Sequence, residues 1–558
     1  MNTSENLSKC LIETKDGPIM GYIDKGEEGI YYKFKRIPYA KPPLGTLRFR
    51  PPSAVTPWKE VIDCTQDADY PIYLHDEKIV GSEDCLYIEI STKSIKNNTP
   101  MPVMFWIGTY VFSVNIDNYF NPSLLNDHGV IFVRCGFRLG PFGFLSINEF
   151  NAPGNCGLKD LVMALKWVQN NIDKFGGDPN NVTIFGSSTG GSAVHLLMMS
   201  PMASGLFHKA IIQSSSVLNN WSLTKNPILS VMELSKKLGI TKLHPVEIVE
   251  ELRLFSAEEI IKTTFYLEDK LAKLDDCNFF DSFFKPCIEN DLEGLPAFLT
   301  KSPILILKTG NFNKVPIIIG SNNIEGSVLQ FINNDFYTNF HKYNEDICHI
   351  VPKSLSCEPK YSKDIGQKLL KFYFGDECEI NENTKTQYLQ LISDYYFLYY
   401  VNKTVRLHSE FAPESPVFYY IVNCAGEWSV PEELSYFCNL GHSAEIPFIF
   451  QIRTTNSPVD PKMCKGSRDS ITTRSRVVKM WTNFAKFGNP TPEDDDPLLQ
   501  IKWDCVENKE KLNYLSIGTE LTKGRNPFHE RMIFWEELHK EYTFLRMLVY
   551  FNDMGVTW

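Results

Sequence analysis

The chain lacks the long apolar runs that a membrane protein needs. None of its 558 residues belongs to a stretch of about 18 consecutive apolar residues, the length that spans a bilayer, and the mostly apolar run at 544–551 is too short. Residues 1–17 are mostly polar and do not contain the apolar core of a secretory signal. We therefore expect a protein without a membrane span that works in the cytoplasm or elsewhere inside the cell.

Basic tracts and metal-binding spacings are missing as well. The net charge is −11 at pH 7 and the lysines and arginines are dispersed, which argues against nucleic acid or an anionic membrane as a partner. The 14 cysteines show no C-x-x-C or Cys/His spacing, so the sequence predicts no metal site and favours reduced thiols over a disulfide framework. Internal repeats are also absent, and a hydrophobic content of 43% is enough for a sizeable globular core.

The most informative stretch is residues 186–190, which read Gly-Ser-Ser-Thr-Gly. Apolar and β-branched residues lead into this motif, and an apolar, helix-compatible run follows it. The pattern is typical of a nucleophile elbow, in which a strand turns sharply into a helix and exposes a serine, here Ser188. Because such a serine sits on a strained turn, the positions two before and two after it must be small, and both are glycine. The same residues are also compatible with a strand-to-helix loop that has no chemistry, so the assignment depends on context.

Buried strands and amphipathic helices alternate along the first half of the chain. Continuous apolar runs at 102–107 and 130–133 predict buried strands, and residues 158–175 predict a helix with one apolar face. Short runs at 17–22 and 31–34, placed between glycines, predict antiparallel strands at a sheet edge. Strands that alternate with helices indicate an α/β fold with a central, mostly parallel sheet flanked by helices.

Several further segments carry a resemblance to a known family. Together with the elbow, they resemble the type-B carboxylesterase and cholinesterase family over nearly the whole chain; they lie at residues 154–160, 175–179, 205–210, 213–214 and 481–491. The resemblance implies a single α/β-hydrolase domain over residues 1–558 that hydrolyses a small hydrophobic ester without a metal or other cofactor. Within the family, the polar start of the chain is similar to the intracellular alpha-esterases of insects. The oligomeric state stays open.

The acid of a catalytic triad should follow the serine and precede the histidine in this fold. An apolar run at 315–320 predicts a buried strand, and Glu325 lies on the loop after it. The residues alone favour a glutamate at a helix N-terminus, stabilised there by the helix dipole. The resemblance instead places the family's catalytic glutamate on Glu325.

The setting of His442 differs from that of the other histidines that follow Glu325. Gly441 precedes it on a predicted loop, and an apolar segment follows at 446–450. This setting resembles the family's histidine loop. His442 would take the proton from Ser188 and return it to the leaving alcohol, while Glu325 holds the orientation of the imidazole.

The sequence departs from the family at the oxyanion hole. The family's His-Gly-Gly-Gly-Phe turn falls on residues 108–112, which read Gly-Thr-Tyr-Val-Phe, so Tyr110 and Val111 replace the two oxyanion glycines. Glycine allows the positive φ angles and the close approach that such a turn needs, whereas β-branched valine disfavours them. We expect the backbone N–H of Thr189 to survive as the third donor. The elbow also has Ser187 and Thr189 where the family usually has an acidic residue and alanine.

Two functions therefore remain open. The complete set of Ser188, Glu325 and His442 favours a carboxylic ester hydrolase that works through an acyl-serine intermediate. The replaced oxyanion glycines favour a catalytically impaired, esterase-like protein that binds or sequesters hydrophobic esters or organophosphates, or that binds a protein partner. The physical reason is that the loss of one oxyanion donor typically costs about 10²–10³ in rate. We take the hydrolase as the main prediction and the impaired protein as its alternative.

Overall fold

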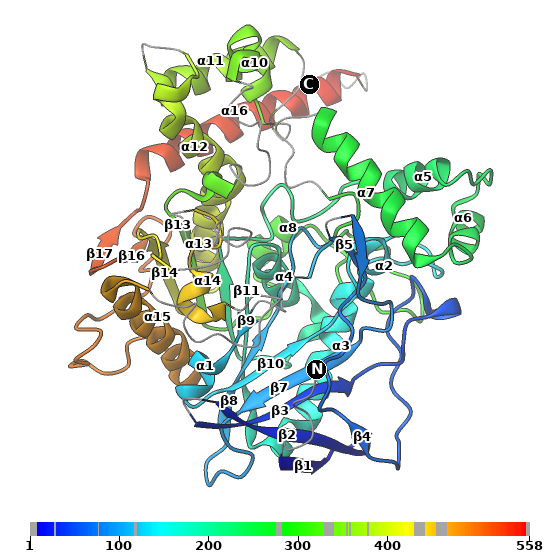
Figure 1. Cartoon of the computed structure of the whole chain (residues 1–558). Helices are drawn as coiled ribbons and strands as arrows, with labels where there is room; N and C mark the ends of the chain where they lie inside the picture. Colours follow the sequence, from blue (N-terminus) through cyan, green and yellow to red (C-terminus); the bar gives the residue numbers. More distant parts are fainter. Residues whose placement is uncertain are drawn as a thin grey trace.

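A thirteen-stranded sheet forms the centre of the molecule, with helices on both of its faces (Figure 1). The computed structural model describes residues 8–26, 29–75, 77–115, 120–274, 282–328, 340–352, 355, 359–375, 379–428, 441–452 and 466–553. In spatial order the strands are β1 (Ser8–Glu13), β2 (Pro18–Gly26), β3 (Gly29–Pro38), β7 (Tyr87–Thr92), β10 (Ile131–Cys135), β8 (Met101–Trp106), β11 (Gly177–Ser187), β12 (Lys209–Gln213), β13 (Ile317–Asn322), β14 (Val417–Val422), β16 (Asn513–Ile517) and β17 (Leu521–Arg525), with β4 (Ile62–Asp63) paired to β2. Two small sheets pair β5 (Tyr73–His75) with β6 (Lys78–Val80) and β9 (Phe120–Asn121) with β15 (Gln451–Ile452).

The middle of the large sheet is parallel and its edges are antiparallel. Parallel pairs run from β10 through β8, β11, β12, β13 and β14 to β16. The strands β1, β2, β3 and β7 on one side, and β17 on the other, join by antiparallel pairs. The predicted mostly parallel sheet with antiparallel strands near the N-terminus is therefore confirmed. Because the parallel strands end at the same edge, the residues that follow them come together there.

The helices lie between these strands in the order that the sequence predicts. They are α1 (Ser123–Asp127), α2 (Gly140–Phe144), α3 (Cys156–Asn171), α4 (Thr189–Met199), α5 (Pro227–Lys237), α6 (Pro245–Leu252), α7 (Ala257–Leu274), α8 (Pro303–Thr309), α10 (Phe340–Glu345), α11 (Pro359–Phe374), α12 (Lys385–Ser393), α13 (Tyr399–Phe411), α14 (Ile446–Ile449), α15 (Arg468–Phe487) and α16 (His529–Asp553). The predicted helix at 158–175 is α3, whose last turn tightens into a 3₁₀ helix, Ile172–Phe175, before Gly176 ends it at φ 78°. Of the helices in the described ranges, none is both long enough and apolar enough to cross a membrane.

The central strands are apolar throughout because both faces of the sheet are covered. In β13, Ile317 and Ile319 pack into one hydrophobic cluster and Ile318 packs into another, and all three are fully buried. Residues of α3 and α4 belong to the first cluster, and residues of α15 belong to the second. This two-sided burial explains the continuous apolar runs that predicted the strands.

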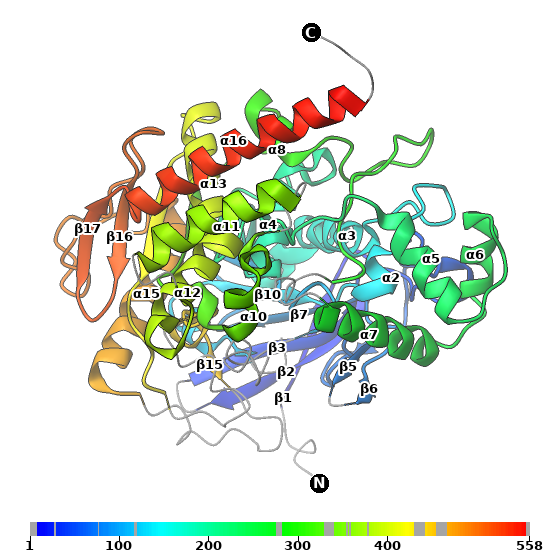
Figure 2. The same ribbon diagram turned by 90° about the horizontal axis from the view of Figure 1, so that it is seen from above.

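A third hydrophobic cluster joins the helices that lie above the sheet in the view of Figure 1. It contains buried residues of α11, α12 and α16. Figure 2 shows α16 beside α11, and Phe372 stacks on Phe534 across this pair with ring centroids 4.0 Å apart. The same cluster includes Val328, which follows Glu325 closely, so these helices are packed against the candidate site.

Candidate active site

Ser188 lies at the junction of β11 and α4. Its φ of 57° and ψ of −128° form a conformation that residues other than glycine rarely adopt, and it is buried. The flanking glycines permit this turn, because a Cβ atom on Gly190 would lie 2.1 Å from the carbonyl oxygen of Ile107. A Cβ atom on Gly186 would lie 2.7 Å from the carbonyl carbon of Gly190. The first N–H groups of α4 place a positive potential beside the serine.

Glu325 and His442 meet at the end of β13. Glu325 opens a short 3₁₀ helix, Glu325–Val328, and its Oε2 atom lies 2.7 Å from Nδ1 of His442. Both side chains are almost completely buried. Gly441 allows the histidine loop to approach this closely, because a Cβ atom there would lie 1.5 Å from the Oγ atom of Ser327. The sequence signal of a glycine before the histidine therefore has a physical cause.

A buried network joins the histidine loop to three strand ends. Glu445, three residues after His442, accepts hydrogen bonds at Oε1 from Ser187 Oγ at 3.0 Å and from Gln213 Nε2 at 3.2 Å. Its Oε2 accepts from Asn322 Nδ2 at 2.6 Å. Because Ser187 ends β11, Gln213 ends β12 and Asn322 ends β13, one carboxyl group holds these strand ends to the loop that carries His442.

Asn322 bridges two buried carboxyl groups. Its backbone N–H donates to Glu325 Oε1 at 2.6 Å, and its side-chain nitrogen lies 3.4 Å from the same oxygen while it also donates to Glu445. Burial raises the pKa of Glu445, and the neighbouring Glu325 raises that pKa further. Reasoning from the sequence missed both Asn322 and Glu445. The only feature of the sequence that could have pointed to these two residues is that each lies three residues from a predicted triad member.

The walls beside His442 are aromatic. The ring of Phe397 lies 4.5 Å from the His442 ring, measured between centroids. Phe397 belongs to a single-turn π-helix, Asp394–Leu398, between α12 and α13. The carbonyl oxygen of Tyr396, in the same turn, accepts a hydrogen bond from Trp221 Nε1 at 3.0 Å. The side of the imidazole that faces Phe397 is therefore apolar, and the turn that carries Phe397 is held by a specific hydrogen bond.

The turn at residues 110–114 is closed on itself. Tyr110 N–H donates to the carbonyl oxygen of Val114 at 2.9 Å, and Val114 N–H donates back to Tyr110 at 3.0 Å. Val111 adopts φ 46°, so a β-branched residue occupies the left-handed region that it ordinarily disfavours. The N–H of Tyr110 is thus committed within the turn. The backbone N–H groups of Val111 and Thr189 are the remaining candidate oxyanion donors.

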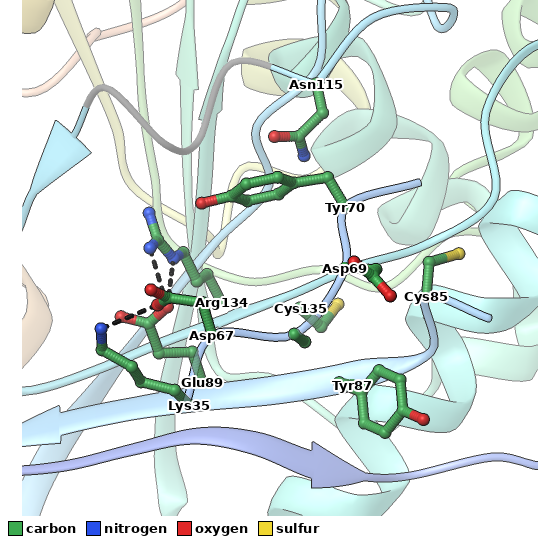
Figure 3. Close-up of a pocket in the computed structure, with 12 residues that line it drawn as sticks. Lys35, Asp67, Asp69, Tyr70, Cys85, Tyr87, Glu89, Asn115, Arg134 and Cys135 are labelled. Atoms are coloured by element: carbon green, nitrogen blue, oxygen red, sulfur yellow. Dashed lines mark hydrogen bonds and ion pairs between the residues drawn. The ribbon is translucent and has the colours of Figure 1, made fainter. Parts of the chain in front are cut away.

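A separate cavity lies beside β7 and β10, and it does not fit an ester (Figure 3). Its lining includes two ion pairs, Lys35 with Asp67 and Arg134 with Glu89. Its volume is about 40 Å³, enough for water molecules but far below the roughly 300 Å³ at which ligand pockets begin. Within the described ranges, no cluster of three or more His, Cys, Asp or Glu side chains is arranged to hold a metal ion.

Comparisons with known proteins agree with this architecture. A family model described as the carboxylesterase family matches residues 8–535. Juvenile hormone esterase of Tribolium castaneum is 30% identical over 95% of this chain and 93% of its own length, and esterase FE4 of Myzus persicae is 31% identical over 88% and 86%. The crystal structure of juvenile hormone esterase from Manduca sexta, with OTFP covalently attached, superimposes with a TM-score of 0.82 at 25% identity, covering 96% of this chain and 100% of that one.

Proposed function

Because this chain belongs to the carboxylesterase family, we propose that it is a carboxylic ester hydrolase that works through an acyl intermediate on Ser188. The observation that carries the proposal is the buried contact of 2.7 Å between His442 Nδ1 and Glu325 Oε2, at the sheet edge where the elbow serine also lies. The Tribolium castaneum and Myzus persicae relatives have esterase names, and the Manduca sexta protein holds a covalently attached ligand, which supports a covalent intermediate in this fold.

The proposed reaction uses each of the three side chains in one role. Nε2 of His442 removes the proton from Ser188 Oγ as this oxygen attacks the ester carbonyl carbon, and a tetrahedral oxyanion forms. The C–O bond to the alcohol then breaks, and the alcohol leaves with the proton from His442. Water repeats the sequence on the acyl-serine and releases the acid. Glu325 accepts the Nδ1–H bond throughout and stabilises the imidazolium that forms twice per turnover.

The walls of the site favour a hydrophobic ester. Phe397 lies against the imidazole, and Val111 packs against the third hydrophobic cluster, which contains Trp221 and Phe397. An apolar acyl or alcohol group would exclude water from these surfaces, whereas a charged group would have no partner among them. We therefore propose a small hydrophobic ester as the substrate class.

The closed turn at 110–114 supports a second candidate function. With Tyr110 N–H paired to Val114, the tetrahedral oxyanion has at most the N–H groups of Val111 and Thr189 as donors. One missing donor typically costs about 10²–10³ in rate. A protein with such slow turnover would hold its ester or an organophosphate on Ser188 for a long time and would act by sequestration.

Hydrolysis of p-nitrophenyl acetate by the purified protein separates these functions. We expect slow turnover that falls by about 10³ or more in Ser188→Ala, because the nucleophile is lost while the fold is kept. The double change Tyr110→Gly with Val111→Gly should raise kcat, because glycines restore the freedom of the turn to present its N–H groups.

A matched labelling experiment covers the case of no measurable turnover. A radiolabelled organophosphate that modifies the native chain but not Ser188→Ala would support sequestration by a competent nucleophile. A native chain that neither hydrolyses the ester nor reacts with the organophosphate would overturn both functions.

A further inference from the structure

The hydroxyl of Thr189 fastens the turn at 110–114 to the helix that follows the nucleophile. Thr189 Oγ1 donates to the carbonyl oxygen of Thr109 at 2.9 Å, and both residues are buried. Thr109 Oγ1 in turn donates to the carbonyl oxygen of Val114 at 3.3 Å, the same oxygen that accepts the N–H of Tyr110. Two threonine hydroxyls therefore link the first residue of α4 to both ends of the turn.

The middle of the turn is anchored on its other side. The carbonyl oxygen of Phe112 accepts the N–H of Gly140 at 2.7 Å, and the Phe112 ring is buried against Phe144. The hydroxyls of Ser113 and Ser282 lie 2.9 Å apart. The middle of the turn is therefore held by contacts outside the turn, whereas its two ends are joined to each other and to the threonine hydroxyls.

We infer that Thr189 is a positioning residue whose hydroxyl keeps the turn closed and thereby withholds the N–H of Tyr110 from the oxyanion. For that N–H to serve as a donor, its bond to Val114 must open, and the chain at Thr109 must move. The bond from Thr189 to the Thr109 carbonyl opposes this movement, because opening would leave a buried carbonyl without its donor. The effect on turnover rests on the proposed hydrolase function, whereas the closure of the turn does not.

The expected size of the effect follows from the value of one hydrogen bond. Loss of a neutral hydrogen bond shifts a conformational equilibrium by about fivefold. When a competent conformation is a minor one, the rate follows its population, so kcat should rise by about fivefold as well. KM should change little, because an oxyanion donor acts on the transition state rather than on the bound ester.

Two nearly isosteric variants and one matched control test the inference. Thr189→Val removes the donor at almost constant volume, Thr109→Val removes the second bond, and Thr189→Ser keeps a hydroxyl in place. The first measurement is hydrogen–deuterium exchange of the amide of Tyr110, which needs no catalytic activity. We expect exchange about fivefold faster in both valine variants and at the native rate in Thr189→Ser. The second measurement is kcat and KM for p-nitrophenyl acetate, with the rise expected in kcat alone.

The outcomes distinguish the inference from the proposed function. Unchanged protection of the Tyr110 amide in both valine variants overturns the closure, whatever the activity. Faster exchange without any change in the kcat of an active protein overturns the link to the oxyanion. If the native chain is inert toward ester and organophosphate, the proposed function fails, and the exchange rates alone still decide whether Thr189 closes the turn.

Discussion

At the scale of single residues, the fully buried carboxyl group of Glu445 has the clearest consequence for catalysis. It accepts three hydrogen bonds and is close enough to His442 for their charges to interact, so a negative charge on it would stabilise the imidazolium that forms during the reaction. We expect Glu445→Gln to lower kcat by about tenfold, the effect of about 1.4 kcal/mol of lost charge stabilisation. The measurement is the pH–rate profile of the native and variant proteins.

The pH dependence of this effect has a definite sign. Burial raises the pKa of Glu445, so the native carboxyl group takes up a proton as the pH falls toward that raised value. The native protein then resembles the variant, and the difference in kcat should shrink at low pH and be largest at high pH. Ser187→Ala is the control, since it removes one donor and keeps the charge. A variant with native kcat across the whole profile would show that the carboxyl group is only structural.

The residues of the proposed site differ in how far the sequence could predict them. Ser188 was predicted from a local motif, because the elbow needs two glycines at fixed spacing. The resemblance assigned Glu325 and His442 to the triad. Without it, each residue was compatible with a purely structural role. Asn322 and Glu445 were missed because their partners lie on other strands, and nothing in a single chain segment records which buried polar groups will pair.

At the scale of elements, a pair of buried histidines joins α4 to α13. His195 Nδ1 accepts the N–H of Val217 at 3.1 Å, so its proton must be on Nε2, which lies 3.0 Å from Nε2 of His408. Both rings are almost completely buried and neutral in this arrangement. Burial lowers the pKa of His195, and burial lowers that of His408 to about 3. Neither ring is able to take a second proton without breaking one of these bonds.

This pair should make the fold sensitive to mild acid. Between pH 6.5 and 3 the unfolded chain binds protons that the folded pair excludes, so stability is full above pH 6.5 and is lost as the pH falls. At pH 5 the loss is about 2 kcal/mol for His408. We expect His408→Gln, whose carbonyl oxygen is able to accept from His195, to reduce the pH 7 to pH 5 loss by about this amount. Urea unfolding at both pH values measures it, and titrating groups outside this pair cancel between the two proteins. Equal losses would contradict this account.

The bounds of the helices follow the same rule as the site residues. A feature with a local cause was predictable from the sequence, and a feature that depends on distant residues was not. The helix predicted at 158–175 begins at Cys156 and ends at Asn171 before a 3₁₀ turn, because Gly176 closes the segment in the left-handed region. The π-helix Asp394–Leu398 had no sequence signal. It is contacted by residues distant in the sequence, among them Trp221, whose indole nitrogen donates to the carbonyl oxygen of Tyr396.

At the scale of the whole molecule, the proposed site depends on how the parallel strands end together. The elbow follows β11, the acid follows β13 and the histidine loop follows β14, so residues from position 188 to position 442 meet at one edge of the sheet. The parallel sheet was predictable from apolar runs and helix spacing, whereas the acid and the histidine were assigned from the triad order of this fold and from the resemblance. For the turn at 110–114, the sequence predicted only that the family's glycines are replaced. It could not predict that the turn is closed, because the hydrogen bonds depend on where Thr109 and Thr189 lie in the folded chain.

A series of contacts leads from the C-terminal helix α16 to His442, and variants of Trp535 test whether catalysis depends on it. Its indole nitrogen donates to the hydroxyl of Tyr373 at 2.7 Å, which donates to Asp394 at 2.6 Å, the first residue of the π-helix that places Phe397 against His442. We expect Trp535→Ala to cost on the order of 3–5 kcal/mol of stability and to reduce kcat in the molecules that remain folded, because the support of the Phe397 ring is lost.

Two further variants on α16 complete the test. One separates the packing of Trp535 from its hydrogen bond, and the other is a surface control. Trp535→Phe keeps most of the buried area and removes the N–H donor, so it should restore most of the stability and leave Asp394 with a less well-fixed partner. Glu537→Ala changes an exposed side chain of the same helix and should alter neither property. Thermal unfolding and ester hydrolysis are measured on all three proteins. If Trp535→Ala loses stability but its folded fraction retains native kcat, the chain of contacts from α16 to His442 has no catalytic role, and the helix only covers the aromatic cluster.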